Sequence, residues 1–149
     1  MSITIRKATA TDVPVMMDLV KVLAEYEKAA HEVINTEEQM LKDGFGEHPL
    51  FEAILAEEDE TVIGMAIYYY RYSTWKGKRI YLEDIVVKEE NRGSGAGKAL
   101  FEEVISIGKS TACTGMMWQV LDWNESAINF YKKYGTNFSD DWVNCKLNF

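Results

Sequence analysis

The chain has 149 residues, 47% of them hydrophobic and 27% charged, a balance typical of a soluble globular protein with one sizeable core. No apolar run approaches the roughly 18 residues that a membrane helix needs, and the first residues lack the apolar core of a signal peptide. We therefore expect a cytoplasmic protein. The net charge of −8 argues against nucleic acid as a partner and agrees with a cationic substrate.

Residues that commonly hold metals are sparse. Cys113 and Cys145 have neither metal nor redox spacing, and His31 and His48 lie far apart in polar surroundings. We therefore predict reduced cysteines in the core, histidines at the surface and no metal site.

Apolar periodicity predicts the first two elements. Residues 3–7 alternate apolar and polar side chains, as a half-buried strand does. A helix should begin at Thr11 or Asp12, because Pro14 is tolerated in a first turn. Its predicted apolar face consists of Val15, Leu19, Val22, Leu23 and Tyr26.

Capping and turn signals predict the middle of the chain. Thr36 and Gln39 have capping-box spacing, so a second helix should begin there and end at Gly44 or Gly46. The β-branched and aromatic runs that follow predict three strands with turns at residues 58–60 and at Gly77. These strands are expected at residues 51–57, 61–72 and 79–87, the last at the centre of the sheet.

The second half alternates between the two periodicities. We expect a helix over residues 97–108, a strand over 115–120, a helix over 125–134 stopped by Gly135, and a final strand over 142–147. With no linker and no internal repeat, residues 1–149 are predicted to form a single mixed α/β domain in three layers.

The most informative motif is a glycine-rich loop between a predicted strand and a predicted helix. It reads Arg-x-x-Gly-x-Gly from Arg92 to Gly97. Backbone N–H groups at such a helix start attract phosphate. The spacing is not that of a Walker loop or a dinucleotide fingerprint, because Arg92 and Lys98 stand where those motifs have glycine. The alternative is an ordinary tight turn.

A second motif begins at Asn124, where a strand should end and a helix begin. Asn124 is a natural N-cap, and Tyr131 lies two turns later on much the same face. The two side chains could hold parts of one long ligand. The alternative is a capped amphipathic helix with Phe130 and Tyr134 in the core.

Together, Arg-x-x-Gly-x-Gly and Asn-x-x-Ala-x-x-Phe-Tyr-x-Lys-x-Gly resemble the GNAT family of N-acetyltransferases in spacing and order. The stretches at residues 5–9, 23–27, 43–49, 81–84 and 123–125 further resemble its spermidine/spermine and thialysine acetyltransferases. The resemblance implies the GNAT fold, a central mixed and mostly antiparallel sheet flanked by helices. It also implies a homodimer that acetylates a small polyamine, diamine or thialysine-like amine with acetyl-CoA.

The resemblance also implies how coenzyme A binds. Its pyrophosphate would lie on the glycine loop, and its pantetheine arm would run along the preceding strand toward Asn124. Tyr131 would stand near the sulfur as the general acid for the leaving thiolate. The implied cofactor-binding residues are Ile85, Val86, Val87, Arg92, Gly93, Ser94, Gly95, Ala96, Gly97, Lys98, Asn124 and Ser126. Neither motif contains a cysteine to carry the acetyl group, so direct transfer in a ternary complex is expected.

The acceptor amine must bind as a cation and then lose a proton, because an alkylammonium has a pKa of about 10.4. Strand alternation sends Glu83 and Asp84 to opposite faces unless a bulge re-aims one of them. By resemblance Glu83 is the base or the anchor of a water relay; the alternative is a surface carboxylate at a strand end. The implied substrate-binding residues are Tyr26, Glu27, Glu83, Asp84 and Asp140.

Three alternatives remain open. Asp141 could replace Asp140, because the segment before Trp142 is shorter than in the resembling enzymes. The aromatic run over residues 68–72, with Trp75, could line a channel for a cation or could be core and subunit interface. The protein could also acetylate proteins or peptides, or be an acyl-CoA sensor without catalysis.

Overall fold

The computed structural model describes residues 2–149, which form two compact units. The first unit ends at Gln119, and the second spans Val120–Phe149. The strands, all in the first unit, are β1 (Ile3–Lys7), β2 (Glu52–Glu58), β3 (Thr61–Ser73), β4 (Gly77–Val87) and β5 (Met116–Met117). Its helices are η1 (Ala10–Asp12), α1 (Val13–Tyr26), η2 (Ala30–Glu32), α2 (Glu37–Phe45), η3 (Glu89–Asn91) and α3 (Ala96–Ser110).

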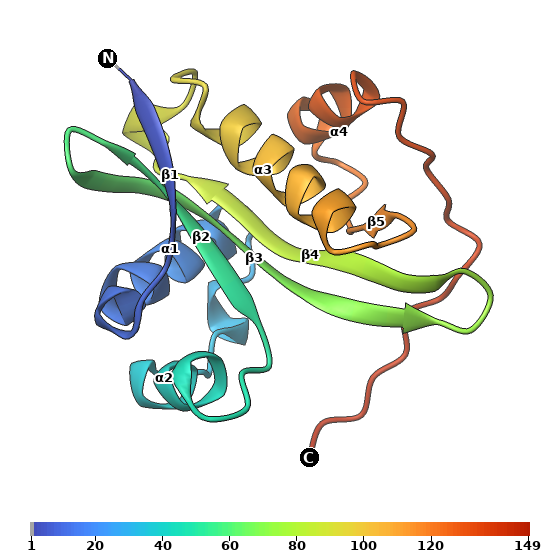
Figure 1. Ribbon diagram of the computed structural model, residues 1–149, viewed down its shortest axis with the longest axis horizontal. Helices are drawn as coiled ribbons and strands as arrows, with labels where there is room; N and C mark the ends of the chain where they lie inside the picture. Colours follow the sequence, from blue (N-terminus) through green and yellow to red (C-terminus); the bar gives the residue numbers. More distant parts are fainter. Residues whose placement is uncertain (1) are drawn as a thin grey trace. The chain divides into compact units, whose positions relative to one another are not determined.

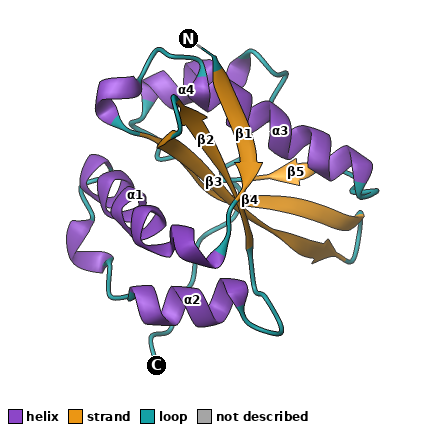
Figure 2. Ribbon diagram, turned by 60° about the vertical axis from the view of Figure 1, so that its left-hand side comes forward, coloured by secondary structure: helices purple, strands orange, loops and turns teal. Residues whose placement is uncertain are grey.

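The five strands form one sheet in the order β1-β2-β3-β4-β5. The first four are antiparallel to their neighbours, and β5 runs parallel to β4. Helices α1 and α2 cover one face of the sheet and α3 covers the other (Figures 1 and 2). The expected fold, a mixed and mostly antiparallel sheet flanked by helices, is confirmed.

The sheet is narrower than the sequence predicts on the β5 side. The predicted strand 115–120 shortens to the two residues of β5, which pair with Ile80 and Tyr81. Residues 142–147 were expected to add a strand and are not one. The middle strand is therefore β3, and the prediction that the strand over 79–87 is central is wrong.

Local signals account for the element boundaries. The Thr36 hydroxyl accepts a hydrogen bond from the Gln39 backbone N–H at 3.1 Å, so the predicted capping signal starts α2, and Gly46 follows its end. The turn between β2 and β3 places Asp59 and Glu60 at φ values of 51° and 62°, which fits a tight hairpin. At the N-terminus of α1, Asp12 accepts two hydrogen bonds from the Arg6 guanidinium at 2.8 and 2.9 Å.

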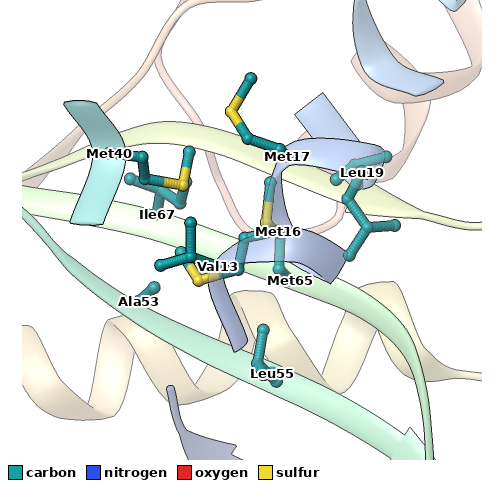
Figure 3. Packing of buried hydrophobic residues seen from close by; sticks show 10 residues of the cluster. Val13, Met16, Met17, Leu19, Met40, Ala53, Leu55, Met65 and Ile67 are labelled. Carbon is teal, nitrogen blue, oxygen red and sulfur yellow. The ribbon is translucent and has the colours of Figure 1, made fainter. Parts of the chain in front are cut away.

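The core on the α1 face packs helix against sheet (Figure 3). Met16 and Met17 of α1 are buried together with Leu55 of β2 and Met65 of β3. The predicted apolar face of α1 is only partly right, because Leu19 is buried whereas Tyr26 is 38% exposed. The buried stripe follows the helical period from residue 13 through 16 and 17, two residues earlier than predicted.

On the opposite face, α3 packs closely on β4. Leu100, Phe101 and Val104 are buried there. A Cβ atom added at Gly108 would stand 2.9 Å from the Ile80 side chain, so only glycine permits this approach. This contact joins the C-terminal end of α3 to the start of β4, and at the other end of the helix a Cβ atom at Gly97 would lie 3.8 Å from the Val87 side chain.

The second unit contains α4 (Glu125–Lys132). The Asn124 carboxamide oxygen accepts a hydrogen bond from the Ala127 N–H at 3.2 Å, as predicted for its N-cap. Residues 142–147 have no strand partner in this unit, and Trp142 and Val143 are 79% and 85% exposed. A strand needs a neighbour to satisfy its backbone groups, which accounts for the missing element. Among residues 2–149, no helix combines the length and apolarity that crossing a membrane requires.

Candidate active site

The glycine loop joins β4 to α3. Gly93 and Gly95 adopt φ values of 84° and 93°, a left-handed conformation that side chains other than glycine rarely tolerate. Gly95 is the N-cap of α3, and the Ser94 hydroxyl accepts a hydrogen bond from the Ala96 N–H at 3.3 Å. Gly97 and Lys98 follow in the first turn, where N–H groups have no carbonyl within the helix to bond. Such an arrangement suits a phosphate group.

The segment of β4 before this loop has an open edge. Strand β3 pairs with β4 along its whole length, but β5 pairs only with Ile80 and Tyr81. Within the described sheet, residues 83–87 therefore have a strand on one side only. Such an edge can accept an extended chain as an added strand. Ile85, Val86 and Val87 lie on this segment, as the predicted pantetheine site requires.

A bulge brings two carboxyl groups to one side of β4. Ile67 pairs with Asp84 and Tyr68 with Leu82, so Glu83 is an extra residue in the ladder. The bulge cancels the alternation that would otherwise separate Glu83 from Asp84. Both residues line the same cavity. The sequence analysis expected them on opposite faces unless a bulge re-aimed one of them.

Charge and burial perturb these groups. Burial, followed by the charges of Glu83 and Glu27, raises the pKa of Asp84 to about 7. Tyr69 donates a hydrogen bond from its hydroxyl to Glu83 Oε1 at 2.9 Å. Burial and this hydrogen bond raise the pKa of Tyr69 to about 12, so the hydroxyl remains a donor at neutral pH. A carboxyl group with a pKa near 7 is matched to accept a proton at physiological pH.

The cavity has a volume of about 310 Å³, the size of a pocket for a small molecule. Asn35 and Tyr69 are its uncharged polar residues, and Glu83 and Asp84 are its charged ones. The remaining six lining residues are Met17, Val20, Met40, Leu50, Phe51 and Ile67.

The C-terminal end of α1 connects the carboxyl groups with the glycine loop. Glu27 follows the helix, and its negative charge contributes to the raised pKa of Asp84. Burial also raises the pKa of Glu27 itself. The Arg92 guanidinium carbon lies 4.8 Å from the centroid of the Tyr26 ring, a cation–π contact. Tyr26, predicted to bind substrate, thus contacts the loop predicted to bind the cofactor.

Four predicted site residues belong to the second unit. Asn124 is the N-cap of α4, Ser126 is exposed in its first turn, and Tyr131 lies in its last turn with its ring edge-on to Phe130. Asp140, like its alternative Asp141, is exposed. The predicted site residues that the first unit brings together are therefore those of β4, the glycine loop and the end of α1.

Sequence reasoning missed several residues of the cavity. Tyr69 was considered only as part of an aromatic run, although its pairing with Tyr81 across the hairpin places it near Glu83. Leu50 and Phe51 carried no signal of their own, because their role depends on α2 returning the chain to the start of β2. Among residues 2–149, no cluster of three or more His, Cys, Asp or Glu side chains is arranged to hold a metal ion.

Comparisons with known proteins all indicate acetyltransferases. The model of the acetyltransferase (GNAT) family matches residues 16–136. Thialysine N-epsilon-acetyltransferase from Mus musculus is 37% identical over 157 aligned positions, which cover 98% of this chain and 92% of that protein. The spermidine/spermine N(1)-acetyltransferase-like protein 1 from Homo sapiens is 36% identical over 138 positions, covering 88% of this chain and 20% of that longer protein.

A solved structure extends the comparison to the fold. The crystal structure of an aminoglycoside acetyltransferase from an uncultured soil metagenomic sample, in complex with sisomicin, matches with a TM-score of 0.79. The two chains are 15% identical, and the match covers 99% of this chain and 96% of that one, so the likeness concerns the fold alone. From the family match and the close relatives together, the chain belongs to the GNAT family and is an N-acetyltransferase.

Proposed function

We propose that the protein transfers the acetyl group of acetyl-CoA to the amine of a small cationic acceptor, such as thialysine or a polyamine. One observation carries the proposal. Glu83 and Asp84 share a cavity at the start of the open-edged segment of β4, and that segment leads directly to the glycine loop. The names of the mouse and human relatives support the acceptor class.

The residues of the loop fit coenzyme A. The N–H groups in the first turn of α3 are available to the pyrophosphate, with Arg92 and Lys98 supplying positive charge. The pantetheine arm lies along residues 85–87, where a backbone N–H stabilises the charge that develops on the thioester oxygen. Asn124 and Ser126 add contacts from the second unit. The bound acetyl-CoA supplies the activated acyl group.

The acceptor binds in the cavity that Glu83 and Asp84 line, next to the segment 85–87 along which the pantetheine arm lies. Its ammonium group is held by the carboxylates, and Asp84 takes its proton, because the pKa of Asp84 is about 7. Glu83, held by Tyr69, orients the amine or a relay water. Tyr26, Glu27 and either Asp140 or Asp141 contact further parts of the acceptor.

The remaining steps follow from the same assignment. Tyr131 donates the proton that the leaving thiolate needs, and the acetyl group passes directly to the amine in a ternary complex. Residues 1–149 act as one acetyltransferase domain, and the protein works as a homodimer in the cytoplasm.

The test is free-thiol release from acetyl-CoA with purified protein. The acceptors are spermidine, putrescine, thialysine, lysine and a basic peptide. Release with a small amine is the expected result. Release with the peptide alone would indicate a protein acetyltransferase. Coenzyme A binding with no turnover on any acceptor would indicate an acyl-CoA sensor. A Glu83→Gln variant with an unchanged pH profile would remove Glu83 from the amine chemistry.

A further inference from the structure

The face of the sheet that forms the cavity continues onto the projecting end of the β3–β4 hairpin. Strand β2 pairs with β3 only as far as Tyr68, so residues 69–73 extend beyond it together with the start of β4 (Figures 1 and 2). Ile67 and Tyr69 line the cavity, and Arg71 is the next residue on the same face, because side chains on one face of a strand recur at every second position. The cavity face therefore leads to an arginine just outside the cavity.

A continuous series of side-chain contacts joins this arginine to the carboxyl groups. The Tyr69 hydroxyl donates a hydrogen bond to Glu83. The Tyr69 ring is stacked on the ring of its cross-strand partner Tyr81, with 5.2 Å between the centroids and 24° between the planes. The Arg71 guanidinium carbon lies 5.7 Å from the centroid of the Tyr81 ring. Glu83, the two rings and Arg71 therefore form one row of contacts on this face.

Two arginines on this face lack an acidic partner. Arg79 lies directly opposite Arg71 in the β3–β4 register, where two like charges are unfavourable. The Arg79 guanidinium packs against Gly115, where an added Cβ atom would lie 2.7 Å from the guanidinium carbon. Among residues 2–149 neither arginine forms an ion pair, and Arg79 Nε is buried without a hydrogen-bond partner. An anion bound at this face would offset the repulsion between them.

The separation between the two charged regions fits a short amino acid. Glu83 follows Tyr81 by two residues, or roughly 7 Å along the strand, and the Arg71 guanidinium lies over the Tyr81 ring. In extended form, an amino acid with the chain length of lysine spans about 7 Å between its terminal amine and its carboxylate. With its amine beside Glu83, such an acceptor places its carboxylate against Arg71. A polyamine in the same orientation would bring a second ammonium group to the arginines, which repel it.

We infer that Arg71, with Arg79 beside it, binds a carboxylate at the far end of the acceptor, so that the preferred acceptor is an amino acid with a terminal amine rather than a polyamine. The planar guanidinium suits this group, because it can donate two parallel hydrogen bonds to a carboxylate. The inference rests on the proposed acetyltransferase function and narrows its acceptor class. Of the acceptors proposed above, thialysine carries such a carboxylate and the polyamines do not.

The pair formed by ε-aminocaproate and its amide tests the inference. The two compounds have the same length and a single amine, and they differ in the negative charge at the far end. In the thiol-release assay, kcat/KM should be about tenfold higher for the acid than for the amide, as expected for a hydrogen bond between charged groups. Because Arg71 is exposed, this preference should weaken as the salt concentration rises. The shorter γ-aminobutyrate, whose carboxylate does not reach Arg71, should show no such preference over its own amide. Equal values for ε-aminocaproate and its amide at low salt would overturn the inference.

Substitution of Arg71 should remove the preference for the acid. In Arg71→Gln, the ratio of kcat/KM for the acid to kcat/KM for the amide should fall about tenfold. Arg71→Lys should retain part of the ratio, because it keeps the charge and loses the planar fork. Lys76→Gln is the matched control, because Lys76 is an exposed cation in the turn of the same hairpin. A ratio that Arg71→Gln leaves unchanged, or that Lys76→Gln lowers equally, would contradict a direct contact with Arg71.

A binding measurement separates this inference from the proposed function. In protein labelled at the tyrosine rings, ε-aminocaproate should shift the NMR resonances of Tyr69 and Tyr81, and Arg71→Gln should abolish the shift of Tyr81. The resonance of Tyr70 should not move, because Tyr70 lies on the opposite face with its ring against Lys78. These shifts without thiol release on any acceptor would uphold the carboxylate site and defeat the acetyltransferase proposal. Thiol release with the acid and the amide alike, without the shifts, would uphold the enzyme and overturn the carboxylate site.

Discussion

Asp84 provides a direct test of the site's electrostatics through protein stability. Its folded-state pKa of about 7 lies well above the ordinary aspartate value of 3.8, because burial and the charges of Glu83 and Glu27 disfavour the carboxylate. The folded protein therefore holds this proton over a pH range in which the unfolded chain has released it. Raising the pH from about 4 to about 7 thus costs folding stability, and the full cost is present above that range.

The size of the effect follows from the two pKa values. Linkage gives a destabilisation of about 1.7 kcal/mol at pH 5 and about 4 kcal/mol at pH 8, relative to a neutral side chain. Asp84→Asn is nearly isosteric and cannot ionise. The variant should therefore be more stable than the wild type, by a margin that grows by about 2.5 kcal/mol between pH 5 and pH 8, while losing acetyltransferase activity.

Urea denaturation at pH 5, 6, 7 and 8 measures this margin. A gain of about 2.5 kcal/mol corresponds to a rise in Tm of about 5–10 °C for a chain of this size. Asp18→Asn serves as the control, because Asp18 is exposed on α1 and does not line the cavity. The reasoning fails if Asp84→Asn is no more stable than the wild type at pH 8, or if its margin is the same at pH 5.

Three further predictions concern the loop, the second unit and the N-terminal ion pair. Gly95→Ala should weaken coenzyme A binding in calorimetry and cost about 1–2 kcal/mol in stability, because Gly95 has a φ of 93°. A Cβ atom at Gly97 would lie 3.8 Å from the Val87 side chain, so Gly97→Ala should fold normally. Equal losses of stability in Gly95→Ala and Gly97→Ala would refute the strain argument. Tyr131→Phe should lower kcat about 100-fold with little change in the coenzyme A Kd, and a parallel loss of both would rule out the general-acid role. Asp12→Ala removes the bidentate pairing with Arg6 and should cost about 2–3 kcal/mol at pH 7 in urea denaturation. Because the pKa of Asp12 is lowered to about 2, chiefly by hydrogen bonding to Arg6, the cost should shrink as the pH falls from about 5 toward 2, and a pH-independent cost would contradict the ion pair.

The sequence alone determined the features that arise within a few residues. The cap of α2 at Thr36, the N-cap Asn124 and the left-handed glycines of the loop are set by hydrogen bonds and φ restrictions between near neighbours. The order of the two motifs was sufficient to identify the GNAT family, because that pattern also depends on spacing along the chain.

Only the tertiary structure decided how the site is assembled. The bulge at Glu83 depends on the register between β3 and β4, and it reverses what strand alternation alone predicts for that side chain. The expected strand over residues 142–147 was wrong for a related reason, since a β-prone segment becomes a strand only when another segment pairs with it. The cavity is lined by residues of α1, α2, β3, β4 and the loops that precede α2 and β2, so the contribution of Leu50 and Phe51 could not be predicted from any one stretch. Packing between segments that are distant in the chain sets the surroundings of each carboxyl group, whereas local sequence sets only which residues are available.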